Sequence, residues 1–262
     1  MTIFTSPAQC YSEYRPRYPQ RLIDDLRERT VGERGQRLID WGCGTGELAI
    51  PLSPHFDRVT AIDAVAEMIA MAEANGQRDG VENVEWLTGR AEQLELAPES
   101  CDLIVAGSAF HWMDRELLAR RALTALGSGG ALALAAGAGG GAGNIQRRSE
   151  EWHGLAVECL NGYAGDRPTE PRRRKPETTR AHQDFLGPAG FRVERHEYPT
   201  DYSWRAEEAV GFLYSIGVVS PHLLGDGRED FERELCDALD RLDPAGGLHE
   251  RIDYNLTIAY KP

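Results

Sequence analysis

The sequence contains few cysteines, and they lie far apart. Its 262 residues include five, at positions 10, 43, 101, 159 and 236, without a C-x-x-C pair, and its histidines are not clustered. A disulfide framework needs several paired cysteines, and a zinc site needs closely spaced cysteine or histidine ligands. The sequence therefore predicts neither disulfide bonds nor a metal site.

The sequence also lacks long apolar runs, and its basic residues are outnumbered by its acidic residues. No stretch is long and apolar enough to span a bilayer, and Met1 to Thr5 lacks the basic and apolar regions of a secretion signal. We therefore expect a cytoplasmic location and no membrane partner. Lysine and arginine number 29 against 42 acidic residues, a net charge of -13, which disfavours nucleic acid as a substrate.

A glycine-rich turn is the strongest motif in the chain. An apolar run leads into Asp40, and Gly42, Gly44 and Gly46 follow before another apolar-periodic segment, a pattern typical of a strand turning into a helix. The spacing G-x-G-x-G differs from the G-x-G-x-x-G of dinucleotide sites. Residues 40–46 resemble motif I of class I S-adenosylmethionine (SAM)-dependent methyltransferases. The resemblance implies that Asp40 faces the methionine ammonium and that the glycines admit the cofactor.

A second carboxylate ends the next predicted strand, residues 58–63. Asp63 follows the glycines by about 20 positions, where nucleoside sites place an acidic residue for the ribose hydroxyls. It matches the second cofactor motif of the same family, which implies that Asp63 and the adjacent Ala64 bind the nucleoside. The alternative for Asp63 is a helix N-cap.

The adenine contact is predicted for the loop after the strand at residues 84–87. In the family this loop lies along the adenine edge, and many members have aspartate at the position of Arg90. Arginine has no acceptor for the adenine amino group. The backbone of Ala91 and the carboxylate of Glu92 are therefore the predicted contacts.

A second signature follows the apolar run 101–108, which is typical of a buried parallel strand. Residues 109–114 read Ala-Phe-His-Trp-Met-Asp and resemble the A-F-H-W-F-D segment of one small-molecule branch of these methyltransferases. Ser108 would contact the cofactor, and His111 would lie near both the sulfonium and the acceptor. Its intrinsic pKa suits His111 to act as a base near neutral pH. The alternative is that His111 only shapes the pocket.

Residues 10–19 contain three tyrosines and two prolines and are expected to be extended. They resemble the Y-x-x-x-R-P-x-Y-P leader of the same branch. The resemblance implies that Tyr11 and Arg15 cover the sulfonium and meet the methionine carboxylate. The alternative is a surface arm packed by its tyrosines.

Apolar periodicity predicts the remaining helices and strands. A helix is expected over 20–30, a short or kinked helix around Pro51, a helix ending at Asn75–Gly76 and a turn at 187–190. Asp114 is expected to cap a helix that runs to Leu126. Strict alternation over 251–260 predicts an antiparallel strand near the sheet edge.

Together these elements predict one α/β domain over residues 1–262. The family resemblance implies that the fold is a Rossmann-like, seven-stranded mixed sheet in the order 3-2-1-4-5-7-6, with an antiparallel last hairpin, helices on both faces and a helical cap. Residues 1–136 form the leader and cofactor half, 144–186 and 203–246 are helical inserts that build the acceptor pocket, and 187–202 and 250–262 supply the C-terminal strands. The glycine run 137–143 is expected to be a hinge or loop, and the basic run 172–175 a solvated loop.

The predicted function is methyl transfer from SAM to an oxygen, nitrogen or carbon atom of a small-molecule acceptor, such as a specialised metabolite or small organic acid. Trp112, Trp152, Trp204 and Phe212 are candidates for an apolar pocket wall or, equally, for core packing. Three alternatives stay open: a SAM-binding regulatory protein without turnover, a nicotinamide-dependent oxidoreductase and a nucleic-acid methyltransferase. The acceptor and the oligomeric state are not indicated by the sequence.

Overall fold

The computed structural model describes residues 7–32, 35–137, 151–164, 181–215, 224–242 and 248–262. The chain forms two compact units. The sheet unit contains residues 17–137, 174–198 and 253–262, and the helical unit contains residues 1–16, 138–173 and 199–252. Residues 138–143 of the glycine-rich run and the basic run 172–175 lie outside the described residues.

The sheet has the predicted strand order, β3-β2-β1-β4-β5-β7-β6. β1 pairs in parallel with β2 and β4, β2 with β3, and β4 with β5, whereas β5 and β7 are antiparallel. The strands are β1 (Gly35–Trp41), β2 (Phe56–Asp63), β3 (Val84–Thr88), β4 (Cys101–Gly107), β5 (Leu126–Ala136), β6 (Arg192–Trp204) and β7 (Leu248–Tyr260). The predicted seven-stranded mixed sheet is thus confirmed.

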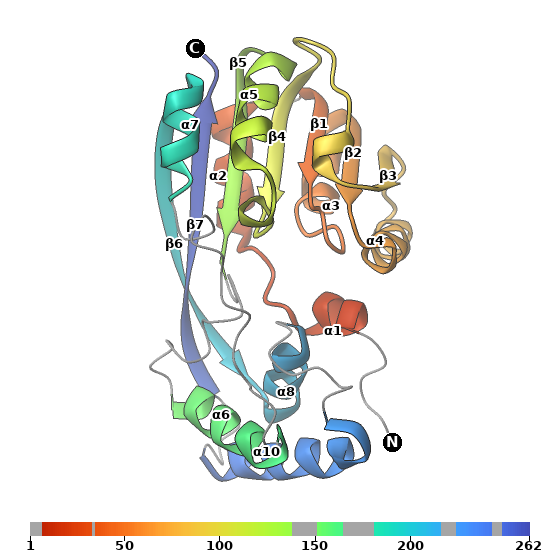
Figure 1. Ribbon diagram of the computed structural model, residues 1–262, viewed down its shortest axis with the longest axis vertical. Coiled ribbons are helices and arrows are strands. Elements are labelled where there is room, and N and C mark those ends of the chain that lie inside the picture. The colour runs from red at the N-terminus through yellow and green to blue at the C-terminus, as the bar shows by residue number, and fades with distance from the viewer. Residues whose placement is uncertain (1–6, 33–34, 138–150, 165–180, 216–223, 243–247) are drawn as a thin grey trace. The chain divides into compact units, whose positions relative to one another are not determined.

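Helices cover both faces of the sheet (Figure 1). α5 and α7 lie on one face and α2 lies on the other. The apolar side chains of α5 and α7 join those of β1, β4 and β5 in one buried core, which includes Ile39, Ile104, Leu118, Leu132 and Leu186. The helices of this unit are α2 (Gln20–Thr30), α3 (Ala49–Leu52), α4 (Ala66–Arg78), α5 (Arg115–Ala125) and α7 (Gln183–Ala189).

Several local predictions are confirmed. The helix over residues 20–30 is present, and the helix with Pro51 has only four residues before a 3-10 turn, η1 (Ser53–His55). A proline inside a helix removes a backbone hydrogen bond, which explains its early end. The Asp114 side chain accepts the backbone N–H of Leu117 at 3.0 Å and caps α5 as predicted.

Three helix boundaries differ from the predictions. α4 continues past Gly76 to Arg78, and the glycine with positive φ is Gly80. Gly76 instead serves packing: a Cβ at this position would lie 3.2 Å from the Trp86 ring. Residues 187–189, expected as a turn, end the helix α7, which stops at the left-handed Gly190. α5 ends at Ala125, and Leu126 already belongs to β5.

The helical unit contains α1 (Pro7–Tyr14), α6 (Glu151–Ala164), α8 (Ala206–Ser215), a 3-10 turn η6 (Gly225–Gly227) and α10 (Arg228–Leu242). Residues 10–14 were expected to be extended, but they are helical, because no proline lies between Pro7 and Pro16. α1 packs on α8 where Gly211 admits the Tyr14 ring, whose nearest atom is 2.3 Å from where a Cβ would lie. Residues 183–186, the end of the predicted insert 144–186, lie in α7 of the sheet unit.

Candidate functional site

The three glycines after β1 adopt backbone conformations that favour glycine. Gly42, Gly44 and Gly46 have φ angles of +67°, +57° and +96°. A Cβ at position 42 would lie 2.5 Å from the Ala109 methyl, so the glycine loop touches the segment that follows β4. Left-handed backbone without side chains lets a ligand lie against the main chain. The loop therefore has the form that the sequence predicted.

Asp40 is a buried carboxylate with unused hydrogen-bonding capacity. It is 1% exposed, its Oδ2 accepts the backbone N–H of Ala49 at 3.0 Å, and its Oδ1 has no partner among the described residues. Burial, with the nearby charges of Glu47 and Asp63, raises the pKa of Asp40 well above its usual value. A buried acceptor without a partner is costly. A cationic donor such as an ammonium group fits this oxygen.

Asp63 ends β2 and holds the glycine loop. Its Oδ2 accepts the backbone N–H of Gly44 at 3.0 Å, and its Oδ1 accepts that of Val65 at 2.9 Å. The N-cap position of α4 is Val65, so the alternative that Asp63 itself caps the helix is wrong. Each carboxylate oxygen can accept a second hydrogen bond. Asp63 and the exposed Ala64 are thus available to hydroxyl groups beside the loop.

Glu92 lies in a 3-10 turn, η2 (Ala91–Gln93), and its carboxylate is already engaged. Its Oε1 accepts the backbone N–H of Asp114 at 3.0 Å and lies 3.2 Å from Arg90 Nη2. Burial alone would raise the pKa of Glu92, but these donors hold it below its usual value. The carboxylate of Glu92 therefore joins η2 to the start of α5. Of the two predicted adenine contacts, the backbone of Ala91 is thus the better candidate.

His111 lies in a 3-10 turn, η3 (Phe110–Trp112), directly after β4. Its half-buried ring lies 4.8 Å from that of Trp112, and Ala109 in the same turn meets Gly42. Ser108 at the end of β4 has a φ of +52°, unusual for a residue with a side chain. The sheet thus brings Asp40, the glycines, Asp63, Ser108 and His111 to its carboxyl edge.

The leader residues Tyr11 and Arg15 belong to the helical unit. The Arg15 guanidinium lies 4.9 Å from the centre of the Tyr11 ring, and the Arg15 N–H donates to the Tyr11 carbonyl at 3.2 Å. Tyr18, from the same motif, belongs to the sheet unit, and its hydroxyl lies 3.2 Å from Ser108 Oγ. Tyr18 was not among the predicted site residues, although it belongs to the leader motif.

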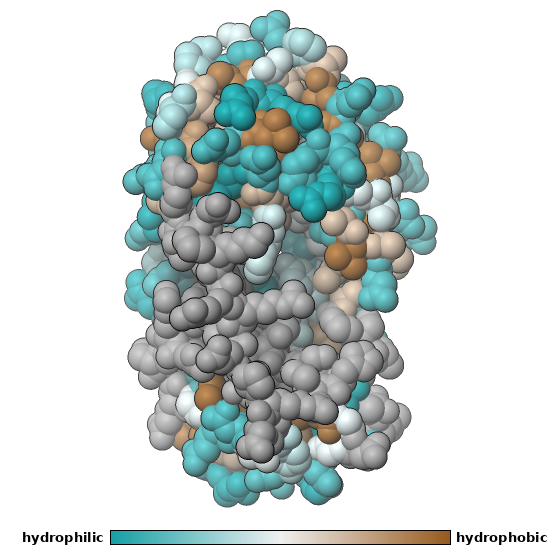
Figure 2. All heavy atoms as spheres, in the orientation of Figure 1, coloured by the Kyte–Doolittle hydropathy of each residue, from teal (hydrophilic) through white to brown (hydrophobic). Residues whose placement is uncertain are grey.

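The candidate aromatic wall divides into two groups. Trp152, Trp204 and Phe212 are each 2% exposed or less, and their rings pack together at 4.7–6.5 Å in the helical unit. They form core packing. Trp112 is 62% exposed beside His111, which leaves its indole available to a ligand. Elsewhere the described surface in Figure 2 is mostly hydrophilic, with scattered apolar residues, as the net charge of -13 leads one to expect.

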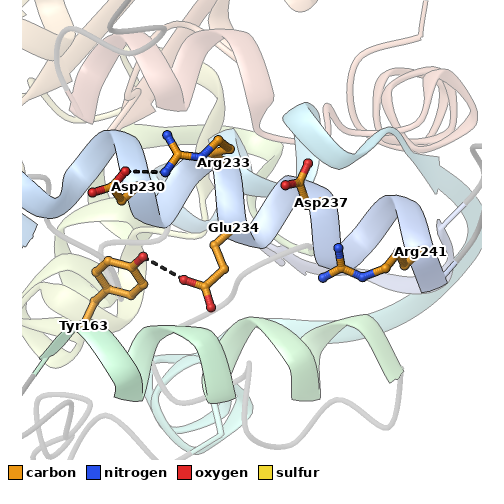
Figure 3. A pocket seen from close by; sticks show the side chains of 6 residues that line it. All are labelled: Tyr163, Asp230, Arg233, Glu234, Asp237 and Arg241. Carbon is orange, nitrogen blue, oxygen red and sulfur yellow. Dashed lines mark hydrogen bonds and ion pairs between the residues drawn. The ribbon is translucent and has the colours of Figure 1, made fainter.

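The helical unit has a polar groove of about 420 Å³ between α6 and α10 (Figure 3). The side chains that line it are Tyr163, Asp230, Arg233, Glu234, Asp237 and Arg241. The Tyr163 hydroxyl donates to Glu234 at 2.7 Å. The groove contains none of the predicted site residues.

Two absences apply to the described residues. No group of three histidine, cysteine, aspartate or glutamate side chains there could hold a metal ion. No helix there has the length and apolarity to cross a membrane.

The carboxyl edge of the sheet lies within a region that matches a known family. Residues 39–134 match the family model described as a methyltransferase domain. A probable S-adenosylmethionine-dependent methyltransferase of Saccharomyces cerevisiae, CRG1, is 31% identical over 125 residues, which are 47% of this chain and 43% of that protein. A malonyl-(acyl-carrier protein) O-methyltransferase of Bacillus cereus is 32% identical over 106 residues, 40% of this chain and 38% of that protein.

The matches thus span less than half the length of these two relatives. The fold extends further: the crystal structure of YcgJ from Bacillus subtilis aligns with a TM-score of 0.56 over 93% of this chain and 99% of that one, at 17% identity. The glycine loop, both strand-end aspartates and the turn with His111 all lie inside the matched region. Over residues 39–134 the chain is therefore similar to a methyltransferase domain, and these residues contain the glycine loop, Asp40, Asp63 and His111.

Proposed function

We propose that this protein transfers the methyl group of SAM to an oxygen, nitrogen or carbon atom of a small-molecule acceptor. The observation that carries the proposal is the buried Oδ1 of Asp40, which has no partner among the described residues and lies beside a glycine loop held by Asp63. A fixed carboxylate at each of two neighbouring strand ends suits a ligand with an ammonium group at one end and ribose hydroxyls at the other.

Each residue of the site has a distinct proposed role. Asp40 accepts the methionine ammonium, and Asp63 with Ala64 accepts the ribose hydroxyls. Gly42, Gly44 and Gly46 present bare backbone to the ligand, while Ala91 and Glu92 border the adenine. SAM, when bound, supplies a methyl group already activated by the sulfonium. The protein then mainly orients the two reactants and excludes water.

The leader supplies the cover in this proposal. Tyr11 and Arg15 contact the methionine carboxylate and exclude water from the sulfonium. Arginine suits this role because its guanidinium pairs with a carboxylate through two parallel hydrogen bonds.

His111 is proposed as the base that removes a proton from the acceptor, with pocket shaping as the alternative. His111→Ala is expected to lower kcat by about 100-fold, within the range for general bases, and to change the Kd of S-adenosylhomocysteine by less than about twofold. A kcat that does not vary with pH in the wild type would contradict the base role and leave pocket shaping.

A specialised metabolite or small organic acid is the proposed acceptor class. One relative's name specifies O-methylation of malonyl-(acyl-carrier protein), which supports a carboxylate oxygen among the possible attacking atoms. The net charge of -13 disfavours nucleic acid as the alternative acceptor. A panel of dicarboxylic acids, their thioesters, phenols and amines, with methylated products identified by mass spectrometry, tests this class.

Calorimetry with S-adenosylhomocysteine and with NAD tests the cofactor. We expect heat from the first and none from the second, and the reverse result would favour an oxidoreductase. The same calorimetry on Asp40→Asn tests the role of Asp40, and Asp102→Asn is its matched control. Asp102 also accepts backbone N–H groups, from Gln36 and Arg37 at 2.7 and 2.8 Å, but it lies at the opposite end of β4 from Ser108. Binding without methyl transfer across the panel would favour a regulatory protein.

A further inference from the structure

Ser108 needs a tether, because its backbone is held in a conformation that glycine adopts more readily. Its φ is +52°, and its N–H donates to the Ala135 carbonyl at 2.8 Å. A non-glycine residue in the left-handed region is uncommon and persists where its surroundings determine it. The environment of Ser108 should therefore contain a group that holds it in place.

Tyr18 is the side chain that meets Ser108. Its hydroxyl lies 3.2 Å from Ser108 Oγ and donates to the Ala135 carbonyl at 3.4 Å. The same carbonyl thus receives the Ser108 N–H and the Tyr18 hydroxyl, which join the ends of β4 and β5.

The sheet unit fixes the Tyr18 ring from two sides. A Cβ at position 107 would lie 3.0 Å from the Tyr18 oxygen, so glycine at this position allows the hydroxyl to approach β4. On the other side, the ring packs edge-on against Tyr254, with 5.9 Å between ring centres, and Tyr254 is 2% exposed. The hydroxyl is therefore held by contacts that do not involve a ligand.

The residues after Ser108 form one side of the candidate site. Ala109 fits against Gly42 of the glycine loop, and the N–H of Trp112 donates to the Ala109 carbonyl at 2.9 Å to close η3 around His111. A shift of Ser108 would therefore move both the surface that faces the glycine loop and the proposed base.

We infer that Tyr18 is a positioning residue: its hydroxyl holds Ser108 in the left-handed conformation and so sets the turn that carries Ala109 and His111. The link from this turn to cofactor binding rests on the proposed function. The contact between Tyr18 and Ser108 does not depend on the proposed function, so the conformational effect and the effect on binding can be tested separately.

Tyr18→Phe tests the inference, since it removes only the hydroxyl. Tyr198→Phe is the matched control: Tyr198 in β6 is another tyrosine of the sheet unit, it is buried, and its hydroxyl donates to Asp25 of α2. In the full chain without ligand, we expect amide hydrogen exchange over residues 108–113 to become about fivefold faster in Tyr18→Phe, the size expected for one lost hydrogen bond, and to stay unchanged in Tyr198→Phe.

Calorimetry with S-adenosylhomocysteine then tests the link to binding. We expect Tyr18→Phe to weaken the Kd about fivefold, and Tyr198→Phe to change it by less than twofold. The Kd of the double variant, Ser108→Gly with Tyr18→Phe, should differ from that of Ser108→Gly by less than about twofold. Glycine adopts a positive φ without the Tyr18 hydroxyl to hold it.

The outcomes separate the inference from the proposed function. Unchanged exchange over residues 108–113 in Tyr18→Phe would overturn the inference, as would a loss of affinity that is equal with and without the Ser108→Gly change. Faster exchange together with no binding of S-adenosylhomocysteine by the wild type would uphold the hold on Ser108 and overturn the proposed function.

Discussion

A buried carboxylate of the helical unit and one of the sheet unit differ in how fully their oxygens are hydrogen-bonded. In the helical unit, Glu232 Oε1 accepts from both Arg228 Nε, at 2.8 Å, and the Tyr214 hydroxyl, at 3.0 Å. In the sheet unit, one oxygen of Asp40 has no partner among the described residues. A buried charge that only stabilises a fold is normally paired, whereas a ligand site keeps some binding capacity unused.

The same contrast applies to tryptophan. Trp204 of the helical unit is 1% exposed and donates to Glu250 at 2.9 Å, whereas Trp112 of the sheet unit is 62% exposed beside His111. In these two comparisons, the buried and paired side chains, Glu232 and Trp204, belong to the helical unit, and the incompletely paired Asp40 and the exposed Trp112 belong to the candidate site.

The largest expected effect compares these two tryptophans. Trp204→Ala should lower the free energy of unfolding by about 3–5 kcal/mol, because it leaves a cavity among packed rings and removes the indole hydrogen bond to the buried Glu250 carboxylate. Trp112→Ala should change it by less than about 0.5 kcal/mol. Urea unfolding of both variants checks this, and similar losses for the two would remove the contrast.

The second prediction concerns the replacement of Asp40 and of Glu232 by the corresponding amides. Asp40→Asn should weaken S-adenosylhomocysteine binding by about 100-fold, since the amide cannot pair with the ammonium by charge. It should also raise the stability at neutral pH. The pKa of Asp40 is raised in the fold, so its contribution is favourable at low pH and is lost as the pH rises and the buried group ionises.

Glu232→Gln should have the opposite effect on stability, a loss of about 2 kcal/mol, because the mostly buried Arg228 guanidinium loses the counter-charge of Glu232. Thermal unfolding at pH 7 gives the sign for both variants. If Asp40→Asn destabilised the protein as much as Glu232→Gln, Asp40 would be a structural group like Glu232.

A third prediction concerns acid stability of the sheet unit. Burial, assisted by the positive charge of Arg115, lowers the pKa of His182 from 6.5 to about 4, where its ring packs 5.6 Å from Phe110. The folded state therefore favours neutral His182. Its contribution is full above pH 6.5 and is lost as the pH falls towards 4.

The loss at His182 should be on the order of 2 kcal/mol after allowance for partial exposure. His182→Gln should flatten this part of the stability profile, measured by urea unfolding between pH 4 and 7. His249→Gln, at an exposed histidine of β7, controls for the loss of a surface imidazole. An unchanged slope in His182→Gln would show that other groups govern acid stability.

The smallest effect is expected in the polar groove of the helical unit. Tyr163 donates to Glu234 there, and this hydrogen bond raises the pKa of Tyr163 to about 12. Because the pair is exposed, Tyr163→Phe should shift Tm by less than about 1 °C. Absorbance titration should show the loss of one late-titrating tyrosine, and a large fall in Tm would mean that the groove is part of the scaffold.

Sequence patterns predicted the sheet because local and global signals agree there. Apolar runs entering Asp40 and Asp63 indicated parallel strands, and parallel strands place their carboxyl ends at one edge. Alternation over 251–260 likewise predicted the antiparallel strand β7 beside β5. Predictions failed where tertiary contacts overrode a local signal, as at Gly76, which leaves room for Trp86 instead of ending its helix.

The sequence alone determined the strands, the glycine loop and the two aspartates, because period, spacing and glycine conformation are local properties of the chain, while the strand order followed from the family resemblance that these motifs carry. Only the tertiary structure decided which polar groups are already used. It engages Glu92 with Asp114, buries Trp152 and Trp204 in a core, and places Tyr18 against Ser108. These contacts join residues far apart in the chain, and no spacing rule connects such residues before the chain folds.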